Sequence, residues 1–136
     1  MRNAVIWTVA LMAFVIAASA SAAQSNQVTI TVPTHALVGT KKSPETYEVS
    51  VQGFARRPAD AYVMIDYAGC AKSFAAEYKR AGKDGRVRWP VDGSFQHNSY
   101  WGSDFAGVDH ACGYLVAKGS GTVLASSRVT FRIHSR

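Results

Sequence analysis

The sequence has few cysteines and lacks the short motifs that mark common catalytic sites. Its 136 residues include two cysteines, Cys70 and Cys112, whose separation excludes the CxxC spacing of a reactive thiol pair. No Gly-x-Ser-x-Gly motif is present, so the sharp turn that exposes a nucleophilic serine in many hydrolases is not predicted. Internal repeats and low-complexity segments are also absent, which excludes repeat architectures.

The start of the chain has the three parts of a secretory signal peptide. A short cationic segment with Arg2 precedes an apolar run at residues 4–18, and small residues follow. The run is too short for a membrane span, so no stable membrane insertion is expected after cleavage. We predict a signal peptide at 1–23 with cleavage after Ala23, Ala20 and Ala22 being alternative sites. The protein is therefore expected to be secreted, either extracellular or periplasmic.

Acidic residues are scarce in the part that remains after cleavage. Removing 23 of the 136 residues leaves 113, enough for one domain at 24–136. The whole chain has 15 Lys and Arg against 9 Asp and Glu, and the loss of Arg2 lowers its formal charge from +6 to +5. A surplus of this size favours solubility and specifies no partner by itself.

The two cysteines are predicted to form a structural disulfide. Export places them in an oxidising compartment, where a pair of cysteines is usually joined. Closing the loop from Cys70 to Cys112 is expected to stabilise the fold by about 4 kcal/mol.

Alternating apolar and polar residues predict most of the secondary structure. Turn-forming residues separate one alternating stretch from the next, notably at 41–44, 56–60 and 118–121. Strands are predicted at residues 28–32, 47–52, 61–67, 86–89, 94–97, 110–117 and 123–133. The strand at 61–67 is apolar on both faces, and a bulge at Ser126 and Ser127 is expected in the last strand.

Two segments depart from this pattern. Residues 72–80 have helical spacing of Phe74, Ala75 and Tyr78, with Gly82 at the end, and predict one short helix. Residues 93–110 are rich in Gly, Ser, Asn and aromatic residues and are interpreted as a long loop that leads into the strand at 110–117. Loops of that length in a compact domain are usually functional or disordered, and the aromatic residues argue against disorder.

The strand pattern favours an antiparallel sandwich over its main alternative, a closed barrel. In a sandwich the third and the penultimate strands are antiparallel neighbours. Cys70 follows the end of the first of these and Cys112 lies near the start of the second, which brings the two cysteines side by side.

Several stretches resemble a bacterial extracellular immunoglobulin-like or fibronectin type III-like module. The resemblance is carried by residues 28–33, the step Val38-Gly39, residues 47–55 and the terminal hairpin from 111 to 133. An antibody-type domain would have a cysteine in its second strand, and this chain has none there. The resemblance implies an all-β, antiparallel immunoglobulin-like sandwich of about seven strands with one disulfide and at most one short helix. It implies no activity.

The loop at 93–110 contains residue types that could support chemistry. Donors for zinc or copper are present, and so are the components of a hydrolase, but their spacing matches no known motif. The donors are His97, Asp104, Asp109 and His110, and the serines beside them are Ser94, Ser99 and Ser103. The simpler interpretation is that the aspartates shape turns and His110 forms a hydrogen bond, so neither a catalytic residue nor a metal or other cofactor is predicted.

The same loop is the predicted binding segment. Its predicted binding residues are Phe95, His97, Tyr100, Trp101 and Phe105. Aromatic residues on an exported sandwich contact sugar rings or protein partners, or they cover one open end of the sandwich as a second core. We predict a non-enzymatic recognition or accessory domain with a protein or cell-surface glycan as partner. A small metal-dependent or hydrolytic enzyme that uses the same loop is the alternative.

A basic segment offers a second candidate surface. Its cations and aromatic residues could together hold an anionic polymer such as a cell-wall phosphate polymer or a surface glycan. They are Lys72, Lys79, Arg80, Lys83, Arg86 and Arg88, interleaved with Phe74, Tyr78 and Trp89. Glu77 and Asp84 interrupt the run, which favours an ordinary solvated face, and no nucleic-acid partner is predicted for an exported chain.

Overall fold

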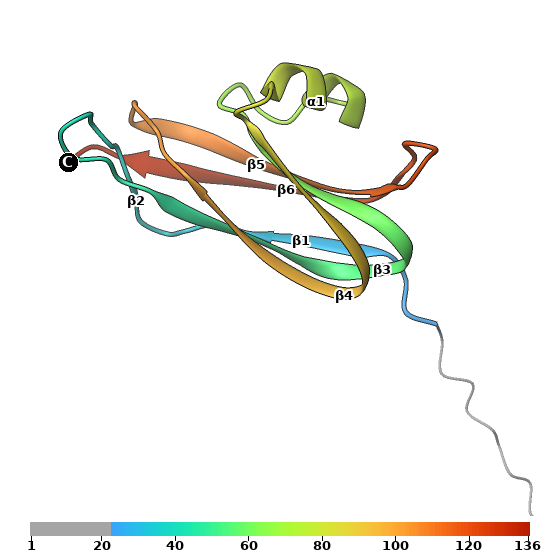
Figure 1. Ribbon diagram of the computed structural model, residues 1–136. Helices are drawn as coiled ribbons and strands as arrows, with labels where there is room; N and C mark the ends of the chain where they lie inside the picture. The colour runs from blue at the N-terminus through green and yellow to red at the C-terminus, as the bar shows by residue number, and fades with distance from the viewer. Residues whose placement is uncertain (1–22) are drawn as a thin grey trace, which may run out of the picture.

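The computed structural model describes residues 23–136, which form two β-layers with one short helix on the outside (Figure 1). The predicted signal peptide lies almost entirely outside the described residues. The elements are β1 (Gln27–Thr31), β2 (Ala36–Leu37), β3 (Tyr47–Ile65), α1 (Phe74–Ala81), β4 (Arg86–Trp101), β5 (Gly107–Ala117) and β6 (Val123–His134). No helix within 23–136 is both long and apolar enough to cross a membrane.

The long strands β3 and β4 pass through both layers. Their antiparallel pairing is continuous except for a register shift between Ala55 and Ala59, where Figure 1 shows the pair bending. Gly93, in the facing part of β4, has a φ of 68°, which suits glycine. Residues 56–60 were predicted as a turn between two strands, and this is wrong. Pro58 and its exposed neighbours mark a bend within one strand, because β4 follows β3 around the corner.

Each layer is one part of the folded sheet. The first layer contains β1, residues 47–55 of β3 and residues 93–101 of β4. The second contains residues 86–91 of β4, residues 59–65 of β3, then β5, β6 and β2. All pairs are antiparallel except β2 with β6. The predicted all-β, immunoglobulin-like sandwich is confirmed. Six strands are present among the described residues, because two pairs of the seven predicted strands are each continuous and the short strand β2 was not predicted.

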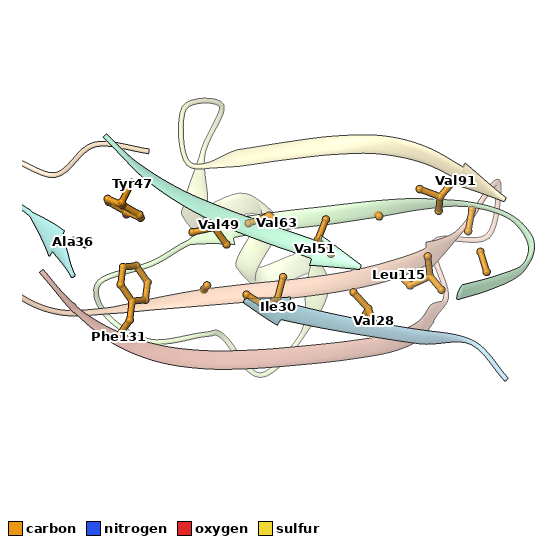
Figure 2. Packing of buried hydrophobic residues seen from close by; sticks show 14 of the residues in the cluster. Val28, Ile30, Ala36, Tyr47, Val49, Val51, Val63, Val91, Leu115 and Phe131 are labelled. Atoms are coloured by element: carbon orange, nitrogen blue, oxygen red, sulfur yellow. The ribbon is translucent and has the colours of Figure 1, made fainter. Parts of the chain in front are cut away.

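The core lies between the two layers (Figure 2). Alternation places Val49 and Val51 of β3 inward in the first layer, and Val63 and Leu115 inward in the second. β1 lies on the opposite side of the core from β5 and β6 and pairs with neither strand. Its Ile30 packs so closely on β5 that a methyl group at Gly113 would lie 2.6 Å from the Ile30 side chain.

The predicted bulge in β6 is at a different residue. Ser126 and Ser127 stay in register with β5, and the shift falls between Leu115 and Val116, so that Leu124 is the extra residue. Ser127 interrupts the apolar pattern for another reason. Its hydroxyl accepts a hydrogen bond from the backbone N–H of Ile30 in the opposite layer, at 3.3 Å.

The helix covers the outer face of the second layer. Ser73 caps its first turn by accepting a hydrogen bond from Ala76 N at 3.2 Å, and Gly82 ends it, as predicted. Phe74 packs edge-on against Tyr62 of β3 and Tyr114 of β5. This second, smaller core explains why the strand predicted at 61–67 is apolar on both faces.

The predicted disulfide is present beside this small core. Cys70 and Cys112 are joined, with their Cα atoms 5.8 Å apart. Met64 and Cys112 are register partners, so the bond links the segment that follows β3 to the neighbouring strand β5, as the antiparallel arrangement predicted.

Candidate binding surface

The segment interpreted as a loop at 93–110 is mainly strand. Residues 93–101 are the second half of β4, residues 107–110 begin β5, and only 102–106 connect them. The prediction of a long loop is therefore wrong, although the short strand predicted at 94–97 does lie within β4. Polar residues such as Ser94, Gln96 and Asn98 suggested a loop by composition, but they face outward on a strand whose inward side chains are mainly aromatic.

Three of the predicted binding residues face inward. Phe95 and Trp101 are half-buried and pack against the main core. His97 stacks on Trp89 with parallel rings 5.1 Å apart, which joins the two layers where β4 runs along both. The indole N–H of Trp101 donates to Ser99 Oγ at 2.7 Å, and that hydroxyl donates to Val49 O at 2.9 Å. These side chains hold β4 in place.

The other two predicted binding residues are displayed to solvent. Tyr100 is 67% exposed at the end of β4, and Phe105 is 70% exposed in the following turn. Ser103 shapes that turn, because its hydroxyl donates to Phe105 O at 2.9 Å and accepts from Phe105 N at 3.3 Å. Glu48, the cross-strand partner of Tyr100, raises the pKa of the tyrosine hydroxyl by hydrogen bonding and by its negative charge.

One edge of β4 is unpaired. Among the described strands β4 pairs with β3 alone, and the backbone of residues 94–101 makes no hydrogen bond to any other described segment. Edge strands are usually protected by charge or proline. The first half of β4 has both, with Arg88, Pro90 and Asp92, whereas residues 93–101 have neither. This uncharged edge, together with Tyr100 and Phe105, is the candidate binding surface.

The residues considered for metal binding or hydrolysis are not brought together. His97 stacks on Trp89, while His110 lies on β5 with its Nδ1 3.1 Å from Asp66 O. Asp109 accepts a hydrogen bond from the backbone N–H of His110, and burial raises the pKa of this carboxyl group. Within residues 23–136 no three His, Cys, Asp or Glu side chains form a group that could hold a metal ion.

A buried polar cluster beneath α1 was not predicted from the sequence. Glu77 is fully buried, and its Oε2 accepts from Ala71 N at 2.5 Å while no partner is present for Oε1 among the described residues. Asp66 forms an ion pair with Arg80 at 2.5 Å. Both Asp66 and Arg80 face Glu77, whose pKa is raised above 4.5 mainly by burial. In the sequence Glu77 appears as an ordinary charge in a basic run.

The raised pKa of Glu77 predicts that the stability of the fold depends on pH. The folded state holds the Glu77 proton more tightly than the unfolded state, so this contribution is fully present below pH 4.5 and is lost as pH rises through the raised pKa. The difference in unfolding free energy between the wild type and Glu77→Gln should therefore shift in favour of the wild type between pH 7 and pH 4. Urea denaturation of both proteins across this range measures the difference. Parallel pH profiles would contradict the assignment.

Comparisons with known proteins give a similarity of fold and no family. A scan against protein-family models found no match, and a search of curated proteins found no similar sequence. Two solved structures of the CARDB domain of the PF1109 protein from Pyrococcus furiosus are similar at 14% identity. The crystal structure, a complex with di-metal ions, has a TM-score of 0.43 and covers 84% of this chain and 100% of that one. The solution NMR structure has a TM-score of 0.42, with coverage of 82% and 96%.

Proposed function

We propose that the protein is an exported, non-enzymatic recognition domain that binds an extended segment of a protein partner along residues 94–101 of β4. The observation that supports this most directly is the long uncharged edge with unpaired backbone groups. An added strand would satisfy those N–H and C=O groups, and such backbone hydrogen bonds supply affinity in other strand-addition complexes.

The compartment is part of the proposal. A disulfide of this kind forms and persists in oxidising surroundings, and the chain begins with the pattern of a signal peptide. Together these support a secreted protein, either extracellular or periplasmic.

The five predicted binding residues divide into two roles in this proposal. Phe95, His97 and Trp101 position the strand from the core side. Tyr100 and Phe105 lie where the edge ends and would contact the side chains of the partner. Exposed tyrosine and phenylalanine supply large contact areas at interfaces.

Lysines placed on the edge should prevent strand addition. The double variant Gln96→Lys/Asn98→Lys adds two charges to β4, whereas Ser50→Lys/Gln52→Lys adds the same charges to their register partners on β3, one strand further in. We expect a library of displayed extended peptides to give binders to the wild type. Titration calorimetry should then show at least about tenfold weaker binding by the β4 variant and a change within about twofold for the β3 control.

Two results of this selection would contradict the proposal. One is a library that gives no binder, and the other is a set of binders that the β4 variant retains at full affinity. A glycan partner at the same surface would be indicated by an oligosaccharide array in which Tyr100→Ala and Phe105→Ala lose binding while the β4 lysines have no effect.

A further inference from the structure

A hollow separate from the candidate binding surface lies between α1 and the first half of β4. It has a volume of about 340 Å³ and is lined by Tyr62, Tyr78, Lys83, Arg86 and Arg88. Three of these five residues are cationic, and none is acidic. The proposed strand-addition surface uses none of them, so the two sites can be tested independently.

Arg86 is held in place by Tyr78. Its Nη1 donates to the backbone carbonyl of Tyr78 at 3.0 Å, and its guanidinium carbon lies 3.7 Å from the centre of the Tyr78 ring. Stacking on an aromatic face restricts a guanidinium group, and its remaining N–H groups can still donate. The cation is therefore positioned before any ligand arrives.

The other two cations are less restrained. Arg88 is 59% exposed in its side chain and lies 4.0 Å from Asp60, a distance at which an exposed ion pair contributes little. Lys83 is exposed in the turn between α1 and β4. An anionic group that enters the hollow would meet both cations in addition to Arg86.

Packed aromatic side chains form one wall of the hollow. The rings of Tyr62 and Tyr78 meet edge-on with centroids 5.9 Å apart, and Phe74 supports both from beneath. Tyr78 remains 37% exposed although Arg86 lies over one face of its ring, so part of its side chain can still contact a ligand. Tyrosines beside positioned cations suit a ligand that has both carbon-rich rings and negative charges.

From this arrangement we infer that the hollow binds an acidic polysaccharide. Guanidinium groups pair with carboxylate or sulfate groups through parallel N–H donors, while sugar rings pack against tyrosine. Charge attraction of this kind is screened by salt. The sequence indicated a run of six cations with interleaved aromatic residues as a candidate surface for an anionic polymer, and the fold brings Lys83, Arg86 and Arg88 of that run together with Tyr62 and Tyr78.

The test compares two double variants that lose the same charge. Lys83→Ala/Arg88→Ala removes two cations of the hollow, and Arg56→Ala/Arg57→Ala removes two exposed cations at the bend of β3. Titration calorimetry with polygalacturonate and with dextran sulfate should show wild-type binding that weakens as salt is raised. The hollow variant should bind at least about tenfold more weakly, and the bend variant should stay within about twofold of the wild type.

Several results would overturn the inference. Equal losses in the two variants would indicate attraction by net charge alone, and full binding by the hollow variant would place the site elsewhere. Equal binding of neutral dextran would show that charge does not determine binding. Tighter binding to single-stranded DNA or to vesicles that contain an anionic lipid would assign the hollow to another class of ligand. Near-UV circular dichroism confirms that each variant is folded.

Discussion

Replacing Cys70 and Cys112 together with serine should lower the free energy of unfolding by about 4 kcal/mol. The bond closes a loop with a sequence separation of 42 residues, and the chain-entropy treatment gives a stabilisation of this size for such a loop. Because small domains are stable by about 5 to 15 kcal/mol, this loss leaves a marginal fold. Cys112 is fully buried, so a serine hydroxyl there would also need a hydrogen-bond partner.

Urea denaturation measures this effect, and the reduced wild type is its control. The wild-type protein under reducing conditions should lose nearly as much stability as the double variant, since both lack the bond. Thiol titration of the oxidised wild type in denaturant should detect no free thiol. A double variant within about 1 kcal/mol of the wild type would contradict the structural role of the bond.

Gly53→Ala should have an effect of similar size through a different cause. A methyl group at Gly53 would lie 1.9 Å from the backbone carbonyl oxygen of Gln27 and 2.9 Å from the Phe95 ring. The oxygen belongs to β1 and cannot rotate away, so β1 must separate from β3. We expect a loss of at least about 3 kcal/mol, the upper part of the range for overpacked sites.

The matched control for this variant is Gln52→Ala, at the exposed neighbouring position. It removes side-chain atoms without adding any, and its unfolding free energy should stay within about 0.5 kcal/mol of the wild type. Amide exchange should also show that β1 loses protection selectively in Gly53→Ala. Unchanged protection of β1 would show that the strand tolerates the methyl group.

Local sequence signals predicted much of the fold. Alternation in residues 47–52 predicted the strand whose Val49 and Val51 are in the core, and the spacing of Phe74 and Tyr78 predicted the helix. The disulfide followed from the positions of its cysteines relative to two neighbouring strands. The strand and the helix follow from patterns within a short window of sequence, and the disulfide follows from the expected order of the strands.

Features that depend on contacts between distant parts of the chain were harder to predict from the sequence. Pro58 and its neighbours have turn composition, and only pairing with β4 shows that they form a bend within β3. Residues 93–101 were assigned to a loop with a strand only at 94–97, because polar and aromatic residues were counted together. The alternation in that strand places Tyr100 on the exposed face and Phe95 and Trp101 on the core face. Which of the predicted binding residues are exposed could therefore be decided only once the strand was known. The buried position of Glu77 depends on the packing of α1.

Amide hydrogen exchange followed by NMR, on the domain alone and saturated with a selected peptide, tests strand addition at β4 most directly. If a peptide adds as a strand, new protection should appear at alternate amides within residues 94–101, where unpaired N–H groups point away from β3. New protection confined to β1 or β6, or none along β4 at saturation, would contradict it.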